Sequence, residues 1–234
     1  MINLGVKLLM RHAERPPYLI ATVLLFATLT SLILRPATGL GHPVTFEGGV
    51  AVSMMSQPGV RLWHTNYSLT SSVALGADYM ELDGEEPSAI GLGRLSVLLK
   101  RWMGRGSQGN LYLLTGVGAA EWGGADLGLA WMGGVQADYE TQRVYTALIG
   151  RVLGDQSPST DTLAYHALYR FGVAPYIAKT NELQAWLVGQ VSYHRGMEGL
   201  PSPTLLMRVF HRSALWELGA DLKGRPWLQL MAHF

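Results

Sequence analysis

The stretch that decides the fold is Asp126–Glu140, DLGLAWMGGVQADYE. Apolar residues such as Leu127, Leu129 and Trp131 alternate with small or polar ones, and the alternation continues to the end of the stretch. A helix would mix these two sets around its axis, whereas a strand places successive side chains on opposite faces. The stretch therefore predicts a long β-strand with one apolar face and one small or polar face.

The same period of two recurs from residue 44 to the end of the chain, between turn signals rich in Gly, Pro, Asp, Asn and Ser. We expect about twelve strands, with ten as the alternative, because Asp161–Lys179 is long and contains Pro175, which interrupts a hydrogen-bond ladder. The expected strands are Val44–Met55, Arg61–Thr70, Ser72–Leu82, Ser88–Trp102, Asn110–Ala120, Asp126–Glu140, Arg143–Leu153, Asp161–Lys179, Leu183–His194, Thr204–Arg212, Ala214–Leu222 and Pro226–Phe234.

Composition narrows the class of protein. Charged residues make up 15% and hydrophobic residues 48% of the 234 residues, which is too little charge for a disordered chain. The formal net charge of +1 offers no basic surface for nucleic acid. The chain has no cysteine, so a disulfide framework, a thiolate metal site and thiol catalysis are excluded.

The first segment of the chain has the pattern of a secretory signal peptide. Tyr18–Leu34 is the one long apolar run, and basic residues precede it. We expect residues 1–41 to be the signal peptide, cut after the small-x-small site Gly39-Leu40-Gly41 with Ala37–Gly39 as an alternative site, and residues 42–234 to be a single barrel domain. Two alternatives are an uncleaved anchor, because the run is just long enough to span a bilayer, and a translation start at Met10.

The second face of the strands is too weakly charged to be the outside of a soluble barrel. It consists of Gly, Ala, Ser, Thr and Gln with isolated charges. Both faces have a suitable environment if the apolar face contacts lipid and the polar face lines the interior of the barrel. Because unpaired backbone groups are costly in lipid, the strands are expected to close. The predicted fold is an all-β, antiparallel, up-and-down transmembrane β-barrel.

Two sets of residues follow from this arrangement. The polar phase of the strands predicts the residues that line the lumen: Glu47, His64, Asn66, Asp78, Arg94, Asp126, Gln136, Asp138, His166, Arg170, Gln184, Gln190, His194, Arg208, Glu217, Asp221, Gln229 and His233. Aromatic residues near strand ends predict a membrane-interface girdle: Trp63, Tyr79, Trp102, Trp122, Tyr139, Tyr193 and Trp227.

After its leader, the whole chain resembles the small bacterial outer-membrane β-barrels. Its last residues, PWLQLMAHF, resemble the signal by which the assembly machinery recognises such barrels, with Leu228, Leu230 and Phe234 at alternate positions. Ala232 stands where a bulkier residue is usual. The resemblance implies a Gram-negative outer membrane, insertion by that machinery, contact with outer-membrane lipid and lipopolysaccharide, and a monomer.

The chain is also similar to an uncharacterised porin-like group that begins its mature part with a GHPV-like sequence. The shared motifs are LLKRW at Leu98–Trp102, GSQ at Gly106–Gln108 and NLYL at Asn110–Leu113. This group supplies no catalytic residues. The resemblance to outer-membrane barrels implies that both termini lie in the periplasm, and we then expect the acidic cluster Glu81–Glu86 outside the cell. There it is expected to form a solvated loop, with a cation bridge to lipopolysaccharide as the alternative.

The favoured function is a narrow passive channel for small hydrophilic solutes or ions, because twelve strands lie between a filled and an open barrel. One alternative is a closed structural or partner-binding barrel, since the lumen carries both signs of charge. Another is a lipid-modifying enzyme: His211 and Ser213 are superficially similar to a lipid A deacylase pair, although they sit at an expected turn. Neither G-x-S-x-G nor H-E-x-x-H occurs, so no catalytic residues are assigned.

No cofactor or metal is expected. Met54, Met55, Met80, Met132 and Met231 would suit copper together with His64 and His194, but no ligand spacing defines a site.

Overall fold

The computed structural model describes residues 42–83, 88–122, 127–156, 163–179, 181–194 and 202–234. The signal peptide expected at residues 1–41 and the lumen candidate Asp126 lie outside these residues. In the part of the chain that is described, no helix has the length and hydropathy of a membrane span.

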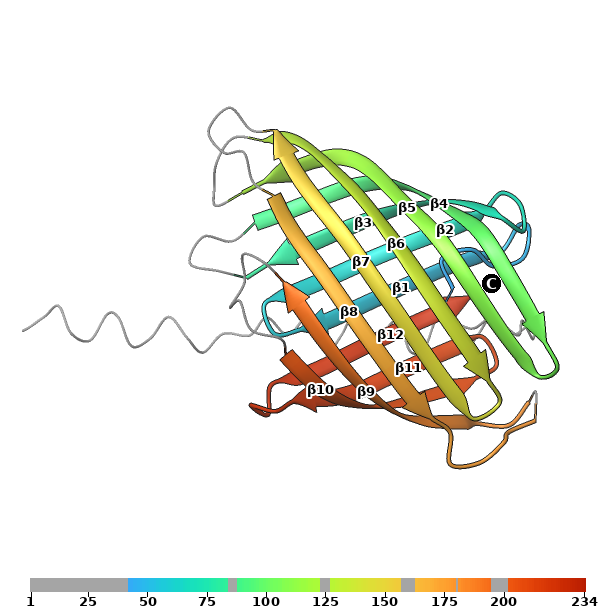
Figure 1. The fold of residues 1–234 in the computed structure, drawn as a ribbon. Helices are drawn as coiled ribbons and strands as arrows, with labels where there is room; N and C mark the ends of the chain where they lie inside the picture. The colour runs from blue at the N-terminus through green and yellow to red at the C-terminus, as the bar shows by residue number, and fades with distance from the viewer. Residues whose placement is uncertain (1–41, 84–87, 123–126, 157–162, 180, 195–201) are drawn as a thin grey trace, which may run out of the picture. The chain divides into compact units, whose positions relative to one another are not determined.

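Within the described residues, twelve antiparallel strands follow one another in sequence order and close into a barrel (Figure 1). They are β1 (Val50–Gln57), β2 (Val60–Ser68), β3 (Val73–Leu82), β4 (Ser88–Gly104), β5 (Ser107–Glu121), β6 (Gly128–Thr141), β7 (Val144–Gln156), β8 (Leu163–Val173), β9 (Gln184–His194), β10 (Ser202–His211), β11 (Ala214–Asp221) and β12 (Pro226–His233). The predicted antiparallel up-and-down barrel is confirmed, with twelve strands rather than ten in these residues.

The two ends of the chain seal the barrel. β1 pairs with β12, and the ladder continues to the last residue. The Val50 N–H donates to the Phe234 carbonyl oxygen at 3.0 Å, and the Phe234 N–H donates to the Val50 carbonyl oxygen at 2.8 Å. The first strand therefore has no open edge against lipid, where unpaired backbone groups would be costly.

Strand boundaries differ from the prediction mainly at two places. β8 ends at Val173, before Pro175, whose missing N–H cannot join a ladder. β1 begins at Val50, six residues later than expected from Val44. The chain turns at Gly48, whose φ of 78° favours glycine, and the Gly49 N–H donates to the Phe46 carbonyl oxygen at 3.0 Å. The residues before Gly48 are thereby free to leave the sheet.

The predicted division into an apolar and a polar face is visible on β6. Leu129 and Val135 are 52% and 51% exposed, whereas the alternating residues Ala130 and Gln136 are buried. Large apolar side chains also point outward along β2–β5 and β7–β11: Tyr67, Leu75, Leu95, Leu113, Val117, Leu148, Tyr169, Leu187, Leu205 and Leu218. Because an exposed apolar surface of this extent is unfavourable in water, the outer wall fits a lipid environment.

The inward residues separate into regions of different polarity. The apolar cluster consists of Val44, Ala74, Ile90, Leu92, Tyr112, Leu114, Ala120, Ala130 and Met132, all from β3–β6 except Val44, which precedes β1. The charged and hydrogen-bonding side chains gather elsewhere in the lumen. The barrel wall thus encloses both a packed apolar core and a polar site.

Candidate functional site

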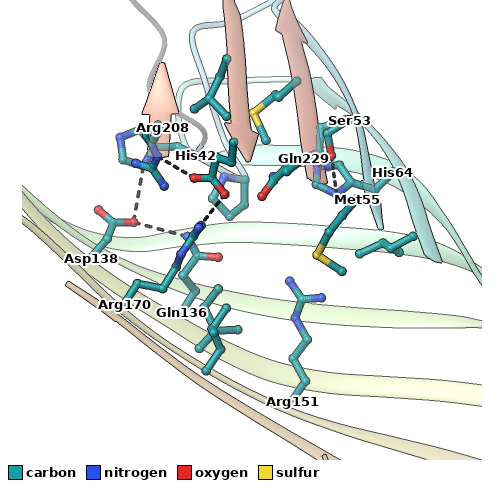
Figure 2. Close-up of a pocket in the computed structure, with 18 of the residues that line it drawn as sticks. His42, Ser53, Met55, His64, Gln136, Asp138, Arg151, Arg170, Arg208 and Gln229 are labelled. Atoms are coloured by element: carbon teal, nitrogen blue, oxygen red, sulfur yellow. Dashed lines mark hydrogen bonds and ion pairs between the residues drawn. The ribbon is translucent and has the colours of Figure 1, made fainter. Parts of the chain in front are cut away.

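A cavity of about 140 Å³ lies inside the barrel, and we call it the polar chamber. Figure 2 shows that side chains from opposite walls point into it. Its polar and charged lining residues are His42, Ser53, His64, Asn66, Gln136, Asp138, Glu140, Arg94, Arg151, His166, Arg170, Arg208, Glu217 and Gln229.

One wall of the chamber is built around a carboxylate shared by two arginines. Arg170 Nη2 donates to Glu217 Oε2 at 2.5 Å, and Arg208 Nε donates to Glu217 Oε1 at 2.6 Å. Arg208 and Glu217 are direct partners on β10 and β11, whereas Arg170 reaches them from β8. The Arg208 guanidinium also lies over the Tyr145 ring, 4.5 Å from its centroid. The buried Glu217 is thereby fully partnered, and the triad carries one net positive charge.

A smaller network lies on β2, β3 and β4. Arg94 Nη2 donates to Asn66 Oδ1 at 2.7 Å and lies 3.4 Å from Asp78 Oδ1. All three side chains are buried. The inward positions of the three neighbouring strands therefore bring together the neutral acceptor Asn66 and the ion pair of Arg94 and Asp78, whose charges cancel.

Residues 42–45, which we call the inner segment, run inside the barrel. His42 Nδ1 lies 3.4 Å from Asp138 Oδ2, and Asn110 Nδ2 donates to Asp138 Oδ1 at 2.7 Å. Val44 is fully buried and packs in the apolar cluster. The Thr45 N–H donates to Ser68 Oγ at 3.0 Å. The inner segment thus occupies space that the barrel wall alone would leave open.

Histidines contact residues of other strands in the lumen. The rings of His166 on β8 and His194 on β9 stack, with centroids 4.2 Å apart. Gln57 Nε2 lies 3.4 Å from His194 Nε2, a contact that joins β1 to β9 across the lumen. Ser53 Oγ lies 3.2 Å from the ring nitrogens of His64. The Gln57–His194 contact narrows the lumen beside these side chains.

Arg151 on β7 is a lining residue that the polar phase did not predict. Its inward neighbours on the same strand are not polar: Ala147, Ile149 and Leu153. The inward face of β7 therefore shows no alternating polar pattern that could have indicated Arg151. The charge itself was a usable signal, because a guanidinium within a membrane strand must face the lumen. Figure 2 shows Arg151 pointing into the chamber without a dashed contact, and it forms no hydrogen bond or ion pair with any residue in the described ranges.

Most predicted lumen candidates occupy inward positions. Those that are buried or line the chamber are His64, Asn66, Asp78, Arg94, Gln136, Asp138, His166, Arg170, Gln190, Arg208, Glu217, Asp221, Gln229 and His233. Gln184 and His194 lie on the same phase of β9 and are partly exposed. Glu47 is a correction: it is exposed in the turn before β1, because the ladder starts only at Val50.

The predicted girdle residues divide into two groups. Those that lie on outward positions are Trp63, Tyr79, Trp102, Tyr139 and Tyr193. Trp122 and Trp227 are corrections. Trp122 packs against the apolar cluster, and Trp227 is 4% exposed and lines the chamber. Trp227 shares its strand phase with Gln229, so the period of two already indicated an inward side chain.

The remaining candidates lie at chain ends and turns. Leu228 and Leu230 take the outward phase of β12, and Phe234 is 39% exposed. His211 and Ser213 flank the β10–β11 turn, where Arg212 has a φ of 55°. No group of three or more His, Asp or Glu suited to a metal ion occurs among the described residues. Of the acidic cluster, Glu81 and Asp83 pair with Arg61 at 3.1 and 2.9 Å.

No family model matches the chain, and no curated protein matches it. Among solved structures, the KdgM porin in complex with disordered oligogalacturonate superposes with a TM-score of 0.51 at 8% identity, covering 80% of this chain and 98% of that one. LpxR from Salmonella typhimurium superposes with a TM-score of 0.42 at 9% identity, covering 80% and 99%. The closed barrel therefore has the same overall fold as the KdgM porin, and its apolar outer wall fits a membrane environment.

Proposed function

We propose that the protein resides in the outer membrane of a Gram-negative bacterium and acts as a narrow passive channel for small hydrophilic solutes or ions. The observation that carries this proposal is the polar chamber. A wall that only had to fill the lumen would be best packed with apolar side chains, since buried charges are costly to desolvate. Here several charged side chains instead surround a cavity.

The size of the lumen supports passage of small solutes only. Barrels of about eight strands are filled by side chains, and those of about 16 to 18 leave an aqueous channel. This barrel lies between these limits, and its cavity measures about 140 Å³. The Gln57–His194 contact and the inner segment narrow the lumen further.

The inner segment is the movable part of this proposal. It belongs to no strand, and its contacts are the weak His42–Asp138 pair, the stacking of His42 on Tyr112, two hydrogen bonds between Thr45 and Ser68, and apolar packing of Val44. Its departure would widen the path without breaking the barrel ladder. As part of the proposal, the barrel is a monomer in contact with lipid and lipopolysaccharide. The assembly machinery inserts it through the signal at Leu228, Leu230 and Phe234.

A second candidate is a closed structural or partner-binding barrel without transport. The apolar cluster favours it, because nine buried residues pack together inside the lumen. The shared Glu217 carboxylate also favours it, since two arginines, on β8 and β10, hold this group in place.

Planar-bilayer recording of Val44→Asp against Phe46→Asp separates these candidates. Val44 is fully buried in the apolar cluster, whereas Phe46 is 48% exposed, so the same added carboxylate meets different surroundings. Burying it at position 44 is unfavourable, so the inner segment should leave the lumen. We expect small conductance steps from the wild type and from Phe46→Asp, and steps several-fold larger from Val44→Asp. Silence from both the wild type and folded Val44→Asp barrels would contradict a channel and support the closed barrel. Circular dichroism establishes that each variant is folded.

A further inference from the structure

The polar chamber contains an arginine, Arg151, that has no partner among the residues that the structure describes. Arg151 forms no hydrogen bond or ion pair with the residues that are described, and its buried Nε–H has no acceptor there. In Figure 2 its guanidinium points into the space beside Met55. A buried guanidinium without an anion is unfavourable, because desolvation is then not compensated. Asp78 is within electrostatic range of Arg151 but is paired with Arg94, so among the described residues no carboxylate is left to balance Arg151.

The carboxylates that line the chamber are engaged or distant. Glu217 is held by Arg170 and Arg208, and Asp138 accepts from Asn110 beside His42. Glu140 stands on β6 six residues beyond Gly134, the register partner of Arg151, which is about 20 Å along a strand.

The wall is shaped to hold Arg151 in this position. A Cβ on Gly134 would lie 2.9 Å from Arg151 Cγ and 2.7 Å from the Gly150 carbonyl oxygen. Glycine at position 134 therefore leaves room for the arginine stem to lie across β6.

Neighbouring groups can complete an anion site. His166 is the register partner of Arg151 on β8, and both His64 and Gln229 line the same chamber. Imidazole N–H and amide N–H groups donate hydrogen bonds to anions. Arg94 is also within electrostatic range of Arg151, but Asp78 balances its charge, so the positive potential at the site comes from Arg151 itself.

We propose that the polar chamber binds one small anion, a phosphate or a short carboxylate, with Arg151 as its main ligand. The cavity of about 140 Å³ limits its size. A protein cavity of about 150 Å³ holds benzene, so an anion of about six non-hydrogen atoms fits and an oligomer does not. The inference rests on the proposed function in that an anion entering this site would use the same path.

Equilibrium unfolding in urea, followed in non-ionic detergent at constant ionic strength, tests the anion site. Anions reach the chain while it is unfolded, so a closed lumen does not prevent binding on refolding. A ligand of the folded state raises the midpoint of unfolding. The probes are inorganic phosphate and acetate, with citrate as an anion too large for the chamber and chloride as the reference.

The variants are Arg151→Gln, Arg151→Lys and, as matched control, Arg61→Gln, whose guanidinium is on the outer face of β2. We expect phosphate or acetate to raise the wild-type midpoint and citrate to leave it unchanged. Losing a charge-assisted hydrogen bond should raise the probe concentration for half effect about tenfold or more in Arg151→Gln. Arg151→Lys should retain part of the effect, and Arg61→Gln all of it.

Two results would overturn the anion site: no rise for either small anion in the wild type, or the same rise in Arg151→Gln. A rise with phosphate alone identifies a tetrahedral anion, and a rise with acetate alone identifies a carboxylate. These outcomes are independent of bilayer recording. A silent bilayer with an intact phosphate or acetate effect would contradict the channel and leave the anion site standing. Conductance steps without any phosphate or acetate effect would contradict the anion site and leave the channel standing.

Discussion

The apolar cluster and the polar chamber occupy the same barrel, and their residues share the inward phase of the strands. Along β4, the inward side chains change from Ile90 and Leu92 to Arg94 and Ser96 within a few residues. The apolar part is packed, whereas the polar part encloses a cavity. Alternation along a strand therefore decides which side chains face the lumen, but not whether the lumen at a given level is filled or hollow.

The two regions are stabilised differently, and removing Glu217 should have the largest effect. Glu217→Ala leaves Arg170 and Arg208 as buried cations without their anion, which is expected to cost about 3–5 kcal/mol. Urea unfolding in detergent measures the loss. Glu121→Ala, at an exposed position at the end of β5, is the control and should change stability by less than about 0.5 kcal/mol. Equal stability of the two variants would mean that the charge triad contributes nothing.

The apolar cluster is expected to respond to lost volume. Leu114→Ala should cost about 2–4 kcal/mol because it leaves a cavity among buried side chains. The neighbouring Leu113 faces outward and is 38% exposed, so Leu113→Ala is the matched control with a smaller loss. The same unfolding measurement applies. A larger loss at position 113 would show that the packed region is not inside the barrel.

Adjacent glycines on β6 test whether the chamber wall is shaped for Arg151. Gly134→Ala should cost about 1–3 kcal/mol, because the methyl group meets Arg151 and the Gly150 carbonyl oxygen. At Gly133 a Cβ has nothing within 4 Å, so Gly133→Ala should be nearly neutral. Unfolding midpoints of the two variants decide the matter, and identical midpoints would contradict a tight Gly134–Arg151 contact.

The contact between the inner segment and the chamber is expected to have the smallest effect on stability. His42→Ala removes a 3.4 Å contact with Asp138, which is worth about 0.5–1.5 kcal/mol. Because this contact holds the inner segment, bilayer recordings should show more frequent openings. His211→Ala, at the end of β10, is the control and should leave the openings unchanged. Fewer openings in His42→Ala would contradict a restraining role.

How much could be predicted from the sequence varied with the range of the interaction. All predicted strand segments overlap a described strand, because alternation and turn residues are local. Glu47 and Trp227 were misplaced for different reasons. A turn at Gly48 keeps Glu47 out of the ladder. Trp227 lies on the inward phase of β12, which the prediction of a girdle residue did not take into account. Arg151 was missed because its strand has mostly apolar inward neighbours.

The sequence by itself determined the period of two, the turns and the apolar outer face, since each depends on residues next to one another in the chain. Closure follows from these in lipid, where an open edge is too costly. Only the tertiary structure decided which charges meet, because register brings Arg170 to Glu217 across 47 positions. It also decided that the inner segment enters the lumen and that Arg151 remains without a partner among the described residues, since both depend on the space left inside the closed wall.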